Sequence, residues 1–389
     1  MPANTGLIVQ PQGTTALIPP QATNPASSGQ RFVPFRVATT ERTNILISDA
    51  GTITGNEQVI DRVLEGTGYI YSISLHLTIT TAGNAAAVAF AEDGPFNALS
   101  SVVFRDPSAE ELNLDGFSLY LANLSMRNYA NFGLDSTMNI VDTTDEYFSA
   151  VTGAGATGGS VLVTEEVPLG INRRNLLGLL GNQDRGVRYQ LRDNINSTGQ
   201  IYSTAPTNPG AFTLERIYES YAVPSPVGAY GPQQWTPDGF GTIHWLTKNV
   251  SEAVPAANVT LNHFVRRLGN MWRFVVLVIR ANTRALGQTS VSTISLKMGD
   301  TDFYNEPYWF RRQLMAKRYG FRFPSGVLVY EMMHDFLPFA GGELGDDWIN
   351  TKDVNTGQFT LTYNGNAQAG GSLTFITDDL AMVGQPIGS

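Results

Sequence analysis

The stretch over residues 69–107 constrains the fold most strongly, because its first part alternates between apolar and polar side chains. Apolar or aromatic side chains fill every second position, at Tyr71, Ile73, Leu75, Leu77 and Ile79. Successive side chains of a strand point to opposite faces, so this alternation predicts a strand with one apolar face. Gly94-Pro95 then breaks the chain, and residues 102–104 form a second predicted strand. A long strand, a corner and a returning strand indicate a β-sandwich.

The chain has 389 residues, too many for one ordinary core, so two domains are expected. Only 15% of the residues are charged, against about 25% in a typical globular domain. A surface with so little charge is suited to burial against other chains. The net charge of −9 argues against wrapping or sequence-specific binding of nucleic acid, because phosphate binding needs clustered lysine and arginine.

The sequence contains no cysteine, which excludes disulfides, thiolate metal sites and a cysteine nucleophile. The first six residues have neither the basic segment nor the apolar core of a signal peptide. The longest uninterrupted apolar run covers residues 274–279, whereas a membrane-spanning helix needs about 20 residues. We therefore expect no signal peptide and no membrane span.

Residues 1–30 are rich in proline, glutamine, threonine and alanine, and they carry almost no charge. Such a segment buries too little apolar surface to fold alone. It is predicted to be either a disordered tail or an extended arm that becomes ordered on a neighbouring subunit. In the second case its anchors are the apolar side chains Leu7, Ile8, Val9, Leu17 and Ile18.

Two helices interrupt the predicted strands. Asp115 is a candidate N-cap for a helix near residues 115–127, in which apolar side chains recur at helical spacing. Asn305 is a candidate cap for a second helix near residues 307–319, with Pro307 in its first turn. Further strands are predicted from alternation or apolar runs at residues 32–47, 161–163, 187–191, 212–221, 274–279, 294–298, 327–330, 359–363 and 372–376.

The two halves of the chain therefore repeat one architecture, with strands, a late helix and more strands. We expect an extended arm at 1–30, a first sandwich at 31–222 and a second sandwich at 242–376. A proline- and glycine-rich connection at 223–241 joins the sandwiches, and a C-terminal tail occupies 377–389.

No pattern in the sequence predicts an active site. Residues 153–158 fit the dinucleotide pattern G-x-G-x-x-G, but a predicted strand follows them where that pattern needs a helix. His76, His244, His263 and His334 are scattered, without the clustering of a metal site. The acidic residues within 343–353 lack the spacing of a calcium loop, which favours a solvated loop over an ion site between subunits. We therefore expect no enzyme activity, no catalytic residue, no cofactor and no catalytic metal.

Basic residues gather on the second predicted helix, at Arg311, Arg312, Lys317 and Arg318. One interpretation is a solvated helix face whose side chains extend over the sheet. The other is an intersubunit contact with acidic loops of a neighbouring chain.

Several stretches together resemble the double jelly-roll major capsid proteins of tectivirus-like bacteriophages, which are tailless and contain an internal membrane. The resemblance covers most of residues 65–335 and depends on the order and spacing of short motifs. These are Asp93-Gly94-Pro95-Phe96-Asn97 with residues 102–107, residues 154–158 with 167–169, Glu219-Ser220-Tyr221 with Pro226-Val227-Gly228, and residues 322–327.

The resemblance implies an all-β chain of two eight-stranded jelly rolls side by side, each with a short helical insertion after its sixth strand. It also implies homotrimers that form pseudo-hexagonal capsomers of an icosahedral shell, assembled in the host cytoplasm. The partners would be copies of the chain, neighbouring capsomers, a penton or minor capsid protein, and an internal membrane. The alternatives are a trimeric receptor- or glycan-binding spike and, with less support, a jelly-roll enzyme.

Overall fold

The computed structural model describes most of the chain between residues 32 and 381. The described ranges are 32–66, 68–81, 88–106, 109–127, 148–151, 159–171, 176, 178–183, 188–229, 231–238, 243–248, 252–254, 258–265, 270–281, 291–319, 322–332, 349–351, 357–364 and 371–381. The predicted arm anchors, the glycine-rich loop at 153–158, His334, the acidic side chains within 343–353 and the end of the tail lie outside these ranges.

Eight strands of the first half form two facing sheets. They are β1 (Glu41–Thr52), β2 (Gln58–Val63), β3 (Gly68–Thr81), β5 (Leu99–Arg105), β6 (Glu110–Leu114), β8 (Gly159–Pro168), β10 (Gln190–Ile195) and β12 (Ala211–Tyr221). One sheet has the order β1-β12-β3-β8, and the other has the order β2-β10-β5-β6. β7 (Phe148–Val151) and β9 (Leu180–Asn182) extend the first sheet.

The second half repeats this arrangement strand for strand. Its strands are β15 (Ile243–Lys248), β17 (Asn258–Phe264), β18 (Met271–Arg280), β19 (Val291–Met298), β20 (Thr301–Pro307), β21 (Val327–Glu331), β23 (Gly357–Asn364) and β24 (Ser372–Ala381). The sheet orders are β15-β24-β18-β21 and β17-β23-β19-β20. In both halves the first strand therefore pairs with the eighth and the second strand with the seventh, which is the strand order of a jelly roll. The all-β prediction with two jelly rolls is confirmed.

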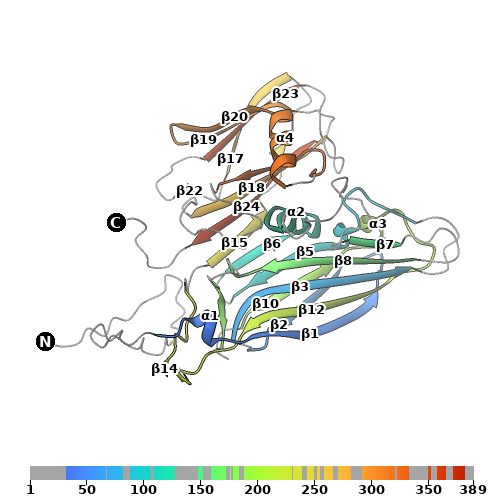
Figure 1. Cartoon of the computed structure of the whole chain (residues 1–389). Helices are drawn as coiled ribbons and strands as arrows, with labels where there is room; N and C mark the ends of the chain where they lie inside the picture. The colour runs from blue at the N-terminus through green and yellow to red at the C-terminus, as the bar shows by residue number, and fades with distance from the viewer. Residues whose placement is uncertain are drawn as a thin grey trace.

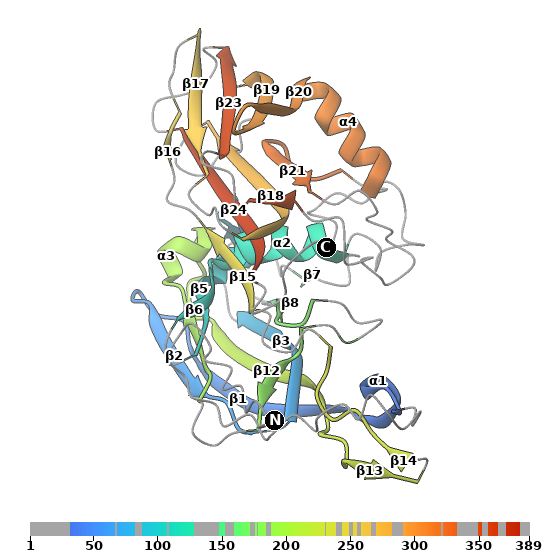
Figure 2. The same ribbon diagram turned by 90° about the vertical axis from the view of Figure 1, so that its left-hand side faces the viewer.

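The halves are joined by more than the connecting segment. β6 of the first jelly roll pairs in parallel with β15 of the second, with Leu112 opposite Leu246. One continuous sheet, β2-β10-β5-β6-β15-β24-β18-β21, therefore runs through both jelly rolls. Figure 1 shows the first jelly roll below and the second above, and Figure 2 shows the same arrangement from the side.

Both predicted helices are present, at α2 (Gly116–Arg127) and α4 (Tyr308–Tyr319). The Ser118 amide donates to Oδ1 of Asp115 at 2.8 Å, which confirms the predicted cap of α2. The predicted cap of α4 is wrong, because Asn305 lies in β20 and Pro307 is the last residue of that strand. Each helix follows the fifth of its eight sandwich strands, and the expected position after the sixth strand is therefore also wrong.

The alternating strands lie as predicted. Ile73, Leu75, Leu77 and Ile79 of β3 are buried in the core, while Ser74, His76 and Thr78 are half-buried on the other face. The apolar run in β18 is buried on both faces, as expected for a continuous run of apolar residues.

Three predicted strands have other limits in the structure. The strand predicted at 187–191 corresponds to β10, which begins only at Gln190. Residues 32–47 are not one strand, because α1 (Phe35–Ala38) precedes β1 and the ring of Phe35 packs edge-on against Tyr69. β24 continues past residue 376 to Ala381, into the segment predicted as the tail.

Short elements complete the described part of the fold. They are β4 (Ala89–Phe90), η1 (Phe96–Ala98), α3 (Thr198–Ile201), β11 (Tyr202–Thr204), β13 (Val227–Gly228), β14 (Gly231–Pro232), β16 (Glu252–Ala253) and β22 (Ile349–Asn350). β13 and β14 form a two-stranded ribbon within the proline- and glycine-rich connection. Among the described residues, no helix has the length and apolar character needed to cross a membrane.

Candidate functional site

The described histidines lie apart and are bonded within the chain. His244 Nε2 lies 2.9 Å from Asp378 Oδ1, and His263 contacts Glu252 through Nδ1 and the Tyr363 hydroxyl through Nε2. His76 Nδ1 lies 3.4 Å from the Thr164 hydroxyl. Within the part of the chain that the structure describes, no three His, Cys, Asp or Glu side chains are grouped so that they could hold a metal ion.

The functional feature that stands out is the junction between the two jelly rolls. Leu112 and Leu246, which lie opposite each other in β6 and β15, are both buried. Lys248, at the end of β15, forms an ion pair with Asp115, the N-cap of α2. The junction therefore combines strand pairing, apolar burial and an ion pair.

A second ion pair crosses the junction, also near the N-terminus of α2. Arg280, the last residue of β18, lies 3.0 Å from Asp93 of the first jelly roll. The same guanidinium stands over the ring of Phe117, 5.4 Å from its centroid. One apolar core cluster contains buried residues of both halves, so the two jelly rolls form one packed body.

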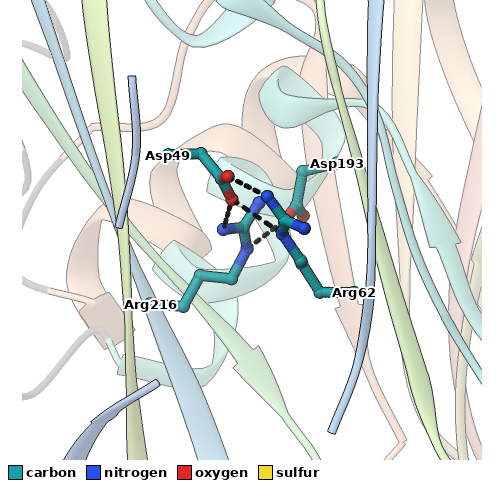
Figure 3. Close-up of polar contacts among 4 residues, drawn as sticks. All are labelled: Asp49, Arg62, Asp193 and Arg216. Carbon is teal, nitrogen blue, oxygen red and sulfur yellow. Dashed lines mark hydrogen bonds and ion pairs between the residues drawn. The ribbon is translucent and has the colours of Figure 1, made fainter. Parts of the chain in front are cut away.

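A cluster of four charged residues extends from the interior of the first jelly roll to its surface (Figure 3). Arg216 of β12 donates from Nε to Asp193 of β10 and from Nη1 to Asp49 of β1, each at 2.6 Å. Arg62 of β2 completes the cluster through its own contacts with Asp49. The two acidic and two basic residues come from both sheets, so they connect the sheets by charge-assisted hydrogen bonds.

The environment shifts the two carboxyl groups of this cluster in opposite directions. Hydrogen bonds from Arg62 lower the pKa of Asp49, against a smaller opposing effect of burial. Burial raises the pKa of Asp193 to about 6, despite the neighbouring Arg216. An open surface pocket of about 320 Å³ adjoins the cluster and is lined by Asp49, Ala50, Gln58, Val59, Ile60, Asp61, Arg62 and Phe212. The two arginines of the cluster pair with its two aspartates, and this internal pairing favours a structural role.

The basic residues of α4 have different roles. Arg311 is buried, forms an ion pair with Glu306, and lies over the rings of Tyr304 and Tyr330 at 4.6 and 4.1 Å. Arg312 donates to the backbone carbonyls of Phe323, Pro324 and Val327 at 2.6–3.1 Å. Arg318 forms an ion pair with Glu331, and Lys317 is exposed. Arg311 and Arg312 therefore stabilise the second jelly roll itself, and Lys317 is directed to solvent.

Sequence reasoning missed the junction and the charged cluster. Asp49, Asp193 and Arg216 lie in three different strands, and the residues they pair with are 23 or more positions away in sequence for Arg216–Asp193 and Arg216–Asp49. The only sequence signal was a charged residue on an otherwise apolar strand face, with Asp193 between Leu191 and Ile195 and Arg216 between Leu214 and Tyr218 at every second position.

The fold places the chain among double jelly-roll proteins. No protein-family model matches the chain, and no curated protein matches its sequence. The major capsid protein of Sulfolobus turreted icosahedral virus matches in structure with a TM-score of 0.63 at 11% identity, covering 88% of this chain and 97% of its own. The Faustovirus major capsid protein has a TM-score of 0.55 at 12% identity, covering 91% of each chain. The major capsid protein of bacteriophage PM2 has a TM-score of 0.50 at 10% identity, covering 90% of this chain and all of its own. At these identities the likeness shows a shared double jelly-roll fold.

Proposed function

We propose that this protein is a viral major capsid protein, the structural subunit of an icosahedral shell. The observation that carries the proposal is the junction at β6 and β15, which joins two jelly rolls with the same strand order into one body. The same double fold occurs along nearly the full length of chains that are named as major capsid proteins. The low content of charged residues supports extensive burial against other copies.

The assembly unit in this proposal is a homotrimer. Each chain contributes two similar jelly rolls, so three chains supply the six units of a pseudo-hexagonal capsomer. The limits of the first jelly roll (31–222), the connection (223–241) and the second jelly roll (242–376) are part of the proposal. The arm at 1–30 and the part of the predicted tail (377–389) that follows β24 would contact neighbouring capsomers, a penton or minor capsid protein, or an internal membrane.

The proposal includes a structural role in the virion and no enzymatic role. Assembly would take place in the host cytoplasm, as in the tectivirus-like bacteriophages that the sequence resembles. No described feature favours a receptor-binding spike, and we do not propose that alternative.

Electron microscopy of the purified protein and of particles tests the proposal. We expect hexagonal capsomers and a single protein that dominates a gel of purified particles. Light scattering that gives a stable monomer at micromolar concentration would contradict the trimer. A copy number far below that of the shell protein would contradict the capsid role.

Deletion of residues 2–30 tests the role of the arm. We expect the shortened protein to form trimers and to assemble shells poorly, because the arm has apolar anchors and acts between trimers. Shells of normal yield from the shortened protein would show that the arm has no such role.

A further inference from the structure

α2 and α4 occupy the same position in the two jelly rolls, but very different fractions of their surfaces are covered. Each helix has 12 residues and directly follows the fifth strand of its jelly roll. Phe117, the second residue of α2, is 5% exposed. Trp309, the second residue of α4, is 64% exposed, and Phe310 beside it is 43% exposed. Two large aromatic side chains therefore face solvent at the position where α2 is buried.

The cover over α2 comes from the other jelly roll of the same chain. Arg280 of β18 stands over Phe117, and β15 pairs with β6, the strand that leads into α2. Figures 1 and 2 show α2 between the two halves and α4 on the outer side of the second half. Among the described residues, the strands packed against α4 are β19, β20 and β21 of its own jelly roll.

The edge strands of the jelly rolls also differ in whether another strand covers them. β6 and β15 are edge strands of their own jelly rolls, and they protect each other by pairing. Their counterparts by strand order are β20 and β1. Among the described residues, β20 pairs with β19 alone and β1 pairs with β12 alone. Each strand thus presents one row of backbone amides and carbonyls that can accept a further strand.

We propose that β20 and α4 of one copy bind the β1 edge of the next copy, so that the contact between chains repeats the internal contact of β6 and α2 with β15. The sheet β17-β23-β19-β20 of one copy would then continue into β1-β12-β3-β8 of the next. Within one chain, the sheets β2-β10-β5-β6 and β15-β24-β18-β21 are already joined in this way, through β6 and β15. The inference rests on the proposed function, because it names the two faces through which the trimer forms.

The geometry of the contact favours a closed ring over a pair. Two different faces of the chain meet, so the interface is heterologous. Copies joined by such an interface form a closed ring when the rotation from one copy to the next is a whole fraction of a full turn. The internal junction already relates the second jelly roll of a chain to the first. If the second jelly roll of one chain is related to the first jelly roll of the next chain by a similar rotation, the jelly rolls of successive chains continue one ring.

The contact between chains differs from the internal junction in one ion pair and in its aromatic side chains. Thr52 ends β1 where Lys248 ends β15, and Pro307 precedes α4 where Asp115 precedes α2. The Lys248–Asp115 ion pair thus has no counterpart at these positions. Trp309, Phe310 and Phe303, all exposed, instead supply aromatic surface of the kind that is enriched at the centre of interfaces.

The first experiment removes the aromatic surface. Light scattering coupled to size-exclusion chromatography should show trimers of the original protein and monomers of the double variant Trp309→Ser/Phe310→Ser. The matched control is Phe264→Ser, which removes a 53% exposed ring from β17, the opposite edge strand of the same sheet, and should leave the trimer intact. Circular dichroism of all proteins checks that the fold is retained.

The outcomes separate this inference from the proposed function. A trimer that survives the double variant, with its fold intact, would overturn the contact and leave the proposed function standing. An original protein that is a monomer would overturn the proposed trimer and this contact with it.

The second experiment uses the absence of cysteine in the chain, so every introduced thiol is unique. Leu112 lies two residues before the end of β6 and Leu246 two residues before the end of β15, and they pair with each other. The counterparts by this count are Asn305 in β20 and Ala50 in β1, which are both exposed.

A chain with both Asn305→Cys and Ala50→Cys should be converted by a short bismaleimide into covalent trimers. Either single variant should stay unlinked, and so should the control Asn305→Cys/Val227→Cys, whose second thiol lies on the exposed ribbon of β13. Crosslinking of Asn305→Cys chains to one another would indicate a twofold contact and overturn the proposal. A trimeric double variant that gives no crosslink would overturn it as well.

Discussion

Arg216 Nε lies 2.6 Å from Asp193 Oδ2, and this ion pair joins the two sheets of the first jelly roll with neither side chain exposed to solvent. Arg216 belongs to β12 and Asp193 to β10, so the pair crosses the interior of the sandwich. Removal of one partner of such a pair leaves the other charge buried without compensation, whereas replacement of both by apolar residues is often tolerated.

We expect Arg216→Met and Asp193→Leu each to lower the free energy of unfolding by about 3–5 kcal/mol, because each leaves an unpaired buried charge. The double variant should recover a large part of that loss. Urea unfolding of the original protein, the two single variants and the double variant gives the coupling free energy between Arg216 and Asp193. The control is Arg192→Met, whose pair with Asp61 is more than one-third exposed and should contribute about 0–1 kcal/mol. Single variants no less stable than the control would contradict the structural role of the cluster.

The junction gives a second prediction at Asp115, which caps α2 and pairs with Lys248. Asp115→Asn keeps an oxygen for the Ser118 amide and loses the charge, while Asp115→Ala loses both. We expect the alanine variant to lose about 1 kcal/mol more than the asparagine variant, which is the usual size of an N-cap contribution. Thermal unfolding by calorimetry measures the difference. Equal melting temperatures of the two variants would mean that the cap adds nothing.

The buried Glu111 of β6 predicts a pH dependence of stability. Burial, followed by the nearby charge of Asp106, raises its pKa from 4.5 to about 8, and Tyr189 lies close enough to respond to its charge. The folded protein therefore keeps a proton on Glu111 that the unfolded chain releases above about pH 4.5. The contribution of this group to stability is complete below pH 4.5 and is lost as the pH rises to about 8.

We expect Glu111→Gln to flatten the decline of stability between pH 5 and pH 8, a decline of at most about 1.4 kcal/mol per pH unit for one group. Urea midpoints at several pH values test this, with Glu110→Gln, an exposed neighbour on the same strand, as the control. An unchanged pH profile in Glu111→Gln would assign the dependence to other groups.

The sequence predicted most of the elements because their patterns are local. The alternation in β3, the apolar run in β18 and the cap at Asp115 are each complete within a few residues, and all three are present in the structure. The two-sandwich architecture followed from the order of these elements. The double jelly roll itself was predicted from the resemblance.

The sequence failed where distant residues decide the structure. The C-terminal tail was predicted to begin at residue 377, yet Asp378 and Asp379 are both buried in β24. Burial acts to raise the pKa of Asp378, but Arg273 and His244 together hold it below its usual value, so the charge is retained inside the sheet. The parallel pairing of β6 with β15 likewise depends on residues more than a hundred positions apart and leaves no local pattern.

The last prediction separates the two interpretations of the basic helix α4. Arg311 is buried between the rings of Tyr304 and Tyr330 and is paired with Glu306, so its guanidinium stabilises the fold of one chain. We expect Arg311→Ala to lower the free energy of unfolding by about 3 kcal/mol, since it leaves the largely buried carboxylate of Glu306 unpaired. Arg311→Lys should recover only part of this, because an ammonium group lacks the planar stacking of a guanidinium.

Lys317 is exposed on the same helix, so Lys317→Ala should change stability by less than about 0.5 kcal/mol. If Lys317 contacts an acidic surface of a neighbouring copy, Lys317→Glu weakens trimers at low salt and does so less at high salt, where such contacts are screened. Unfolding curves and light scattering at two salt concentrations measure both effects. A large loss of monomer stability in Lys317→Ala would contradict its placement on the surface, and trimers of Lys317→Glu that are unaffected at low salt would remove it from the intersubunit contact.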